Sequence, residues 1–235
     1  MMPTIKPARA PENDGGTKRF SLVPALAQRQ MYEALSGLRV ARTGAASGAE
    51  AAEIALCLAL GEDDAVILAG GARGARKVRK DCKVIGGKLA KAQGGALAAA
   101  TIAVVAALLD NPKATALVCA GELDGGTESG QAYRSAFRFA ARHKLPILYL
   151  VASSLRAGGR QKLDLRTLHS ELGIPVFSVD ANDAIAAYRV ATEAVHNARH
   201  LRGPCVIEAL TLAGKSSSPL ELLRGYMERH GSRPL

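Results

Sequence analysis

The sequence predicts an α/β fold in which helices cover both faces of a parallel sheet. Short apolar segments alternate with helical segments along most of the 235 residues, which is the order that builds strand–helix–strand units. The apolar segments are continuous instead of alternating with polar residues, as is typical of strands buried on both faces. No internal repeat with the period of a solenoid is present, so a repeat architecture is excluded.

Two helices are expected before the first strand. Apolar residues at helical spacing from Leu22 to Val40 predict an amphipathic helix. A second helix is expected to end near Leu60. Ser47 followed by Glu50 three residues later has the pattern of a capping box, so Ser47 is the predicted N-cap.

The remaining elements alternate in type. Strands are expected at 65–69, 115–120, 146–152, 176–179 and 205–211. Helices are expected at 94–109, 129–143, 163–172, 183–199 and 220–229. The helix at 94–109 is rich in alanine and has no charged residue, which predicts a buried helix. The basic stretch between residues 70 and 91, punctuated by glycine, has no predicted element.

Composition places the chain among ordinary globular proteins. We expect residues 1–20, which are rich in proline, glycine and charge, to be a disordered tail, and residues 21–235 to form a single domain. The net charge is +10, with 31 lysines and arginines against 21 acidic residues. This balance favours an anionic partner such as a phosphate, nucleic acid or an acidic subunit. An aromatic content of 4% without tryptophan argues against single-stranded nucleic acid, because few rings are available for base stacking.

The cysteines and apolar runs predict a cytoplasmic protein. The four cysteines form no C-x-x-C pair, and three of them lie in apolar runs, as expected of reduced, buried thiols. The longest mainly apolar run, 96–109, is shorter than the roughly 20 residues that span a bilayer. The N-terminal residues contain no apolar region typical of a signal peptide.

Polar residues follow two of the predicted strands. Glu122 and Asp124 lie in the glycine-rich segment after the strand at 115–120, and Ser153 and Ser154 follow the strand at 146–152. Ligands bind beyond the carboxyl ends of parallel strands. If the two strands are neighbours, a carboxylate and hydroxyls could flank a phosphate and its Mg²⁺, a metal that prefers oxygen ligands. The alternative is a glycine-rich turn that only joins strand to helix.

A series of short motifs occurs in a fixed order between about Tyr32 and Gly231. The motifs are Gly48-Ala49-Glu50-Ala51, the Gly/Ala-rich segment 93–109, Lys144-Leu145-Pro146-Ile147, Gly173-Ile174-Pro175, Val179-Asp180-Ala181-Asn182-Asp183 and 203–211. This ordered set resembles the alpha subunits of the E1 component of thiamine-diphosphate-dependent 2-oxo acid dehydrogenases. The resemblance implies the thiamin diphosphate-binding fold, thiamine diphosphate and Mg²⁺ as cofactors, and oxidative decarboxylation of a 2-oxo acid with acyl transfer to lipoyl. It also implies a homo-oligomer or an E1-beta-like partner subunit.

The resemblance assigns the site residues, and several of them depart from the family pattern. The family's G-D-G motif falls on Gly121-Glu122-Leu123, or on Asp124-Gly125-Gly126 when the following helix is the anchor, and its Asn pair falls on Ser153-Ser154. These matches imply that Gly121, Glu122, Ser153 and Ser154 contact the cofactor, with Glu122 and Ser154 as metal ligands.

Two further assignments come from the same resemblance. Arg73 takes the place of the arginine in the family's Tyr-Arg pair that contacts the diphosphate, and could hold a phosphate bidentately. Lys215 takes the place of the histidine in the family's G-x-H-S loop, and is the catalytic candidate. A lysine at that position shuttles protons at neutral pH only if burial lowers its pKa substantially.

Three functions follow from these observations. The first is an E1-alpha-like subunit with a degenerate cofactor site and reduced or lost catalysis, because the scaffold motifs are kept while site residues and site loops are altered. The second is an active subunit that needs a beta partner. The third is a basic module that binds phosphate or nucleic acid through the cations between Arg73 and Lys83. His196 and His200 have the spacing of a metal pair, but no third ligand accompanies them in the local sequence.

Overall fold

The computed structural model describes eight stretches of the chain. These are residues 21–39, 48–69, 72–84, 93–123, 127–154, 164–201, 203–211 and 218–230. The predicted disordered tail at 1–20 lies outside the described residues.

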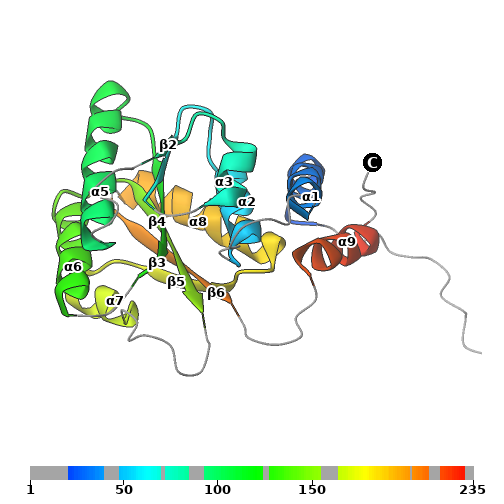
Figure 1. Cartoon of the computed structure of the whole chain (residues 1–235). Coiled ribbons are helices and arrows are strands. Elements are labelled where there is room, and N and C mark those ends of the chain that lie inside the picture. Colours follow the sequence, from blue (N-terminus) through cyan, green and yellow to red (C-terminus); the bar gives the residue numbers. More distant parts are fainter. Residues whose placement is uncertain are drawn as a thin grey trace, which may run out of the picture.

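A six-stranded parallel sheet forms the centre of the molecule, which confirms the predicted fold class (Figure 1). Its strands are β1 (Ala65–Leu68), β2 (Lys83–Val84), β3 (Ala116–Glu122), β4 (Ile147–Ser154), β5 (Val176–Asp180) and β6 (Cys205–Thr211). Their order across the sheet is β2-β1-β3-β4-β6-β5, and every neighbouring pair is parallel. The short edge strand β2 was not predicted, because its two residues are exposed and form no apolar run.

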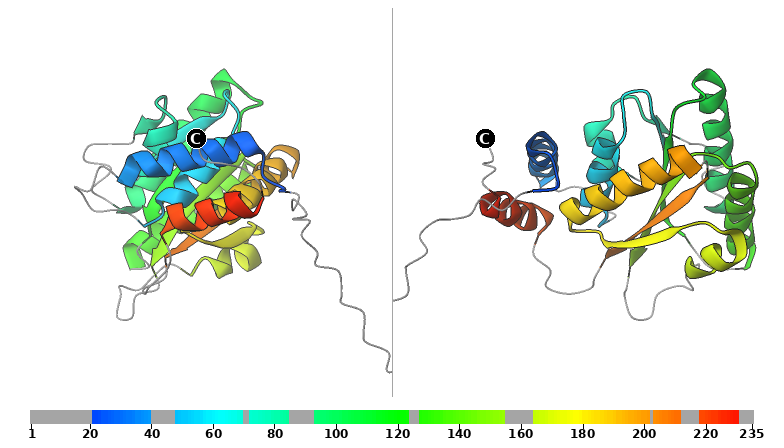
Figure 2. Two further views of the ribbon diagram at one scale, coloured as in Figure 1. Left: turned by 90° about the vertical axis from the view of Figure 1, so that its right-hand side faces the viewer. Right: turned by 180° about the vertical axis from the view of Figure 1, so that it is seen from behind.

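Helices cover both faces of this sheet (Figure 2). They are α1 (Ala25–Arg39), α2 (Glu50–Ala59), α3 (Arg73–Val78), α5 (Gln93–Asp110), α6 (Thr127–Arg142), α7 (Arg166–Leu172), α8 (Ala184–Leu201) and α9 (Pro219–Arg229). Helices α2, α3 and α8 pack on one face, and α5, α6 and α7 on the other. Helices α1 and α9 lie side by side in a further layer outside α2, where Arg224 donates a hydrogen bond to the Tyr32 hydroxyl at 3.0 Å.

The two cores meet at the sheet because its strands are buried on both sides. In β4, Leu148 and Leu150 face the α2 and α8 side, whereas Ile147 and Tyr149 face α5 and α6. The Tyr149 hydroxyl is hydrogen-bonded to the Thr101 hydroxyl at 2.9 Å, and its burial raises the pKa of the phenol. Continuous apolar strands therefore correspond here, as predicted, to strands covered on both faces.

Ser47, the predicted N-cap of the second helix, lies outside the described residues. Helix α2 begins at Glu50 with Ala49 as N-cap, and the Ala49 side chain makes no capping hydrogen bond. A complete capping box occurs instead at α9. There the Glu221 N–H donates to Ser218 Oγ at 3.3 Å, and the Ser218 N–H donates to Glu221 Oε2 at 3.0 Å.

Helix α5 was predicted to be buried, and it is buried on one face only. Leu97, Ala100 and Val104 lie in the core, whereas Ile102 is 65% and Leu109 is 79% exposed. The reason is its position: α5 is apolar on all sides, but it lies in the outer layer of the sheet, where only its inner face meets other described elements. Among the described helices, none has both the length and the apolar character needed to cross a bilayer.

The thiols differ in accessibility, which leads to a first prediction. Cys57, Cys119 and Cys205 are buried, and Cys82 is half-buried. Burial raises the pKa of Cys57 to about 12 and that of Cys205 to about 11, and it raises the pKa of Cys119 well above its usual value. At pH 8 these three thiols therefore stay protonated and shielded, so we expect iodoacetamide to alkylate only Cys82 in the native protein within minutes.

Mass spectrometry of the intact chain tests this prediction. One adduct is expected under native conditions and four in denaturant. Replacing Cys82→Ser should abolish the native adduct. Rapid alkylation of a second thiol in the folded protein would contradict the burial described above.

Candidate functional site at the carboxyl edge of the sheet

The order of the strands indicates where a ligand could bind. Strands β1 and β3 are neighbours, and the chain leaves β1 through α3 on one face and β3 through α6 on the other. In open parallel sheets, ligands usually bind at such a reversal, beyond the carboxyl ends of the two strands. We call this end of the sheet the carboxyl edge.

The two predicted metal-ligand segments meet at the carboxyl edge. Strands β3 and β4 are hydrogen-bonded neighbours, with Gly121 opposite Val151 and Glu122 opposite Ala152. The backbone of Glu122 therefore lies one residue away from the level of Ser153. The sequence analysis expected these two segments to meet only if their strands were neighbours, and they are neighbours. The side chains of Glu122 and Ser154 lie outside the described part of the structure.

Gly121 bends the end of β3. The β3–β4 register shifts between Cys119 and Gly121, and Gly121 has a φ of 70°. This left-handed conformation costs a residue with a side chain about 1–2 kcal/mol, so glycine is the suitable residue. A bulge at a strand end redirects the residues that follow it. Gly121 therefore controls the direction in which the chain leaves β3.

Strand β6 joins the carboxyl edge to α2. The Thr211 hydroxyl donates a hydrogen bond to the Ser153 carbonyl oxygen at 3.3 Å. Gly48, with a φ of 73°, precedes α2, and a Cβ on it would lie 2.9 Å from Thr211 Cγ2. The N-terminus of α2 is therefore packed tightly against the end of β6, so part of the family motif at 48–51 lies at this edge.

Arg73 lies in a different setting from the strand-end pair. It begins α3, is half-buried, and lines a cavity of about 220 Å³. The other lining residues are Leu35, Leu38, Glu50, Ser218, Pro219 and Leu220. None of these described lining residues comes from β3 or β4. The cavity is thus formed by α1 and α9 over the beginnings of α2 and α3.

Glu53 was missed by the sequence analysis, although it helps to position Arg73. This carboxylate on α2 is 3% exposed, and its Oε2 accepts a hydrogen bond from the Gly74 N–H at 2.7 Å. A Cβ on Gly74 would lie 2.4 Å from the Glu50 carbonyl oxygen, so α3 lies directly on α2. A charged residue inside the apolar helix 50–59 is the sequence signal that could have indicated such a buried contact.

The basic stretch between Arg73 and Lys83 does not act as one group. The Arg79 guanidinium hydrogen-bonds both carboxylate oxygens of Asp81, at 2.8 and 2.9 Å, and the carbonyl oxygens of Gly61 and Asp64. This contact holds the pKa of Asp81 at about 2. Arg79 therefore ties the β2 segment to the loop before β1, whereas Arg73 lines the cavity beside α9.

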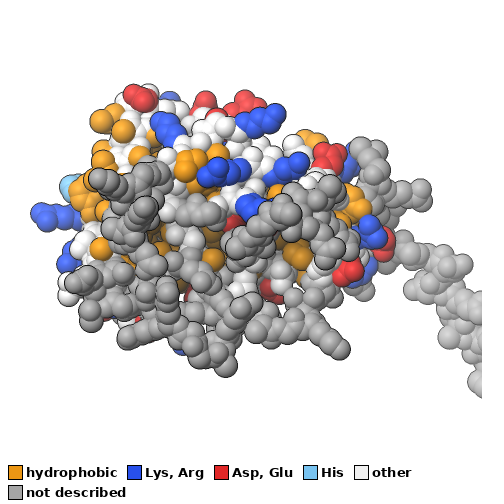
Figure 3. Space-filling model, viewed as in Figure 1, with side chains coloured by type: hydrophobic (Ala, Val, Ile, Leu, Met, Phe, Trp, Pro, Cys, Tyr) orange, Lys and Arg blue, Asp and Glu red, His pale blue; other side chains and the backbone are white. Residues whose placement is uncertain are grey.

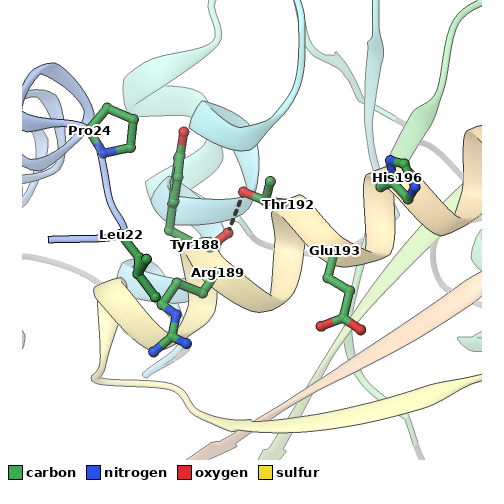
Figure 4. Close-up of a pocket in the computed structure, with 7 residues that line it drawn as sticks. All are labelled: Leu22, Pro24, Tyr188, Arg189, Thr192, Glu193 and His196. Atoms are coloured by element: carbon green, nitrogen blue, oxygen red, sulfur yellow. Dashed lines mark hydrogen bonds between the residues drawn. The ribbon is translucent and has the colours of Figure 1, made fainter.

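A groove of about 560 Å³ beside α8 is a weaker candidate site (Figure 4). Its side chains point in different directions: Tyr188 extends from one side of the helix, whereas Arg189 and Glu193 extend from the other. His196 stacks on His200, with ring centroids 4.1 Å apart. No group of three potential metal ligands occurs among the described residues. Among the described residues, the groove therefore offers no set of metal ligands.

Two of the predicted positions cannot be placed. Lys215, the catalytic candidate, and Asp124, the alternative metal-ligand position, lie outside the described residues. The arrangement that the structure does describe is the bulged end of β3 beside the end of β4 that carries Ser153, next to the reversal between β1 and β3.

These features define an α/β protein in which helices cover both faces of a six-stranded parallel sheet. The family model described as dehydrogenase E1 component matches residues 69–213, more than half of the chain. The chain belongs to the dehydrogenase E1 component family, as the motifs predicted.

Relatives of this chain match over part of its length. The pyruvate dehydrogenase E1 component subunit alpha of Rhizobium meliloti is 36% identical over 94 residues, which cover 37% of this chain and 27% of that protein. The protein of the same name from Porphyra purpurea is 33% identical over 114 residues, which cover 45% of this chain and 33% of that protein. The chain thus spans about a quarter to a third of the length of the curated relatives it matches.

Solved structures show similar arrangements at low identity. Benzoylformate decarboxylase from Polynucleobacter necessarius has a TM-score of 0.48 and 13% identity, with 69% of this chain and 33% of that chain covered. A thiamine diphosphate-dependent 4-hydroxybenzoylformate decarboxylase from Rhodococcus jostii has a TM-score of 0.47 and 16% identity, with 74% and 34% covered.

Proposed function

We propose that this chain is an E1-alpha-like subunit whose cofactor site has diverged, so that the family's decarboxylation chemistry is reduced or lost. The proposal rests on the residues at the carboxyl ends of β3 and β4. The scaffold of the edge is kept, with β3 and β4 as neighbours and a bulge at Gly121. The residues in the family's ligand positions are changed to Glu122 and to Ser153 and Ser154.

The donor set explains why we expect weak binding. Mg²⁺ with a diphosphate usually takes one or two carboxylates and other oxygen ligands in an octahedron. Glu122 supplies a carboxylate on a side chain one methylene longer than aspartate, and the neutral hydroxyl of Ser154 is a weaker ligand than an amide oxygen. Arg73, the candidate for the diphosphate, lines a cavity with residues of α1, α2 and α9. The residues present do not fit thiamine diphosphate and Mg²⁺ as the family holds them, and no catalytic step is assigned through that group.

Calorimetric titration of the full chain with thiamine diphosphate and Mg²⁺ tests the proposal. We expect no saturable heat below about millimolar cofactor, because the Glu122 carboxylate has a longer reach than aspartate and the Ser154 hydroxyl is a weaker ligand than an amide oxygen. The double substitution Glu122→Asp with Ser154→Asn restores the family's residue types, and we expect it to strengthen Mg²⁺-dependent binding by at least about tenfold, or ~1.4 kcal/mol.

A matched control separates the site from general changes in charge and polarity. Glu193→Asp with Ser135→Asn makes the same replacements at exposed positions of α8 and α6, and no gain in binding is expected. Micromolar binding by the unchanged chain, abolished by chelating Mg²⁺, would overturn the proposal. It would favour an active subunit in which Glu122 and Ser154 hold the metal, Arg73 holds the diphosphate and Lys215 lies near the reacting centre.

A further inference from the structure

The cavity between α1 and α9 is lined by charges of both signs, which the proposed function does not use. Of its described lining residues, Arg73 is the cation and Glu50 the anion. Both residues are half-buried, and each takes part in further polar interactions in the structure. Because the two formal charges cancel, the described lining has no excess positive charge to attract a diphosphate. It suits a ligand that itself carries one charge of each sign.

The surface over the flanking helices has the same mixed character. Figure 3 shows basic and acidic side chains close together at the α1 and α9 side of the molecule. Helix α1 contains Arg29 and Glu33, and α9 contains Arg224 and Glu228. The net charge of +10 is therefore not concentrated on these two helices, and a ligand without net charge needs no such field to approach.

A hydroxyl beside the cavity is suited to a carboxylate. Ser218 is the N-cap of α9, and its hydroxyl oxygen accepts a hydrogen bond from the Glu221 N–H at 3.3 Å. A hydroxyl also has one proton to donate, and the positive end of the helix dipole lies at the same place. A carboxylate in the cavity would thus have this hydroxyl and the Arg73 guanidinium as donors, and a guanidinium can donate two parallel hydrogen bonds to it.

The rest of the lining is mainly aliphatic. Leu35 and Leu220 are buried and Leu38 is half-buried. The cavity volume of about 220 Å³ equals that of about seven water molecules in the liquid. It lies below the range of about 300–1,000 Å³ that is typical of sites for drug-sized ligands. The cavity therefore suits a small aliphatic molecule.

We propose that this cavity binds a small aliphatic α-amino acid in its zwitterionic form. Arg73 and Ser218 hold the carboxylate, Glu50 holds the ammonium group, and the leucine side chains enclose the aliphatic part. The two charged groups of the ligand take over part of the polar interactions that Glu50 and Arg73 otherwise make. The inference goes beyond the proposed function, because the described lining includes no residue of β3 or β4 and the site requires no bound cofactor.

Calorimetric titration of the full chain with L-leucine tests the proposal. We expect saturable binding with a Kd below about 1 mM. Isocaproate has the carboxylate and the aliphatic chain of leucine without the ammonium group, and isoamylamine has the ammonium group without the carboxylate. Each should bind about tenfold more weakly than L-leucine, because each makes only one of the two charge contacts.

Two substitutions separate the charge contacts. Glu50→Gln should weaken the binding of L-leucine about tenfold and leave isocaproate bound at least as tightly as before, because isocaproate has no ammonium group. Arg73→Gln should weaken the binding of both. Glu33→Gln on α1 and Arg76→Gln on α3 make the same replacements at exposed positions and should leave binding unchanged. Circular dichroism checks that each variant is folded, and the comparison of leucine with its two analogues needs no variant.

Inorganic pyrophosphate distinguishes this site from a diphosphate site. With Mg²⁺ present, millimolar pyrophosphate should not displace L-leucine from the chain. Displacement would assign Arg73 to a phosphate ligand and overturn the proposal. Equal binding of L-leucine and isocaproate, or no saturable binding of L-leucine up to about 10 mM, would overturn it as well.

Discussion

Replacing Asp64→Ala is expected to lower the free energy of unfolding by about 3–5 kcal/mol, the largest single effect in this protein. The carboxylate is 4% exposed and precedes β1. Its Oδ2 accepts a hydrogen bond from the Gly61 N–H and its Oδ1 one from the Thr115 N–H, each at 2.7 Å, and it forms an ion pair with Arg199.

The physical reason is that one carboxylate satisfies three partners from distant parts of the chain. Thr115 precedes β3 and Arg199 belongs to α8, so Asp64 joins the amino ends of two strands to a helix on one face of the sheet. Its removal leaves two N–H donors without their acceptor and deprives the guanidinium of its counter-charge. Arg199 Nε also donates to the Thr115 hydroxyl at 3.1 Å, so the loss affects one connected network.

Urea denaturation followed by far-ultraviolet circular dichroism measures this effect. Asp63→Asn is the control, because Asp63 is the exposed neighbour of Asp64, and surface substitutions usually change stability by less than about 0.5 kcal/mol. A loss below about 1 kcal/mol for Asp64→Ala would show that the network contributes little.

Gly74→Ala is expected to cost about 2–4 kcal/mol, the second largest effect. The added Cβ would lie 2.4 Å from the Glu50 carbonyl oxygen and 3.0 Å from Glu53 Oε2. The first contact is with backbone, which cannot rotate away, so α3 must move off α2. That movement also lengthens the buried hydrogen bond from the Gly74 N–H to Glu53.

The same denaturation measurement tests this prediction. Gly203→Ala provides the matched control, because a Cβ on Gly203 would meet nothing within 4 Å, and we expect it to be nearly neutral. Equal stabilities of the two alanine variants would contradict the close approach of α2 and α3.

The predictions of secondary structure are correct where the local pattern of apolar residues reflects burial. The apolar runs at 146–152 and 205–211 correspond to β4 and β6, because a strand covered on both faces needs apolar side chains at every position. The elements that were missed are held by distant contacts instead. Arg79 anchors the β2 segment through the carbonyl oxygens of Gly61 and Asp64, and no local pattern in the sequence indicates such a contact.

Two segments of the sequence have the spacing of a capping box, and the structure describes one of the boxes in full. Ser47 with Glu50 and Ser218 with Glu221 have the same spacing of serine and glutamate. The second pair forms the box, with Pro219 at the start of α9. At α2 the helix starts at Glu50 with Ala49 as N-cap, and Ser47 lies outside the described residues.

Sequence alone determined the α/β class, the family and the identity of the residues that follow each strand. These properties depend on the types of side chain and on their order in the sequence. Only the tertiary structure decided that β3 and β4 are neighbours, that Arg73 lies with α1 and α9, and that one face of α5 is left exposed. The physical reason is that strand order and helix coverage arise from contacts between segments far apart in sequence, which no local pattern encodes.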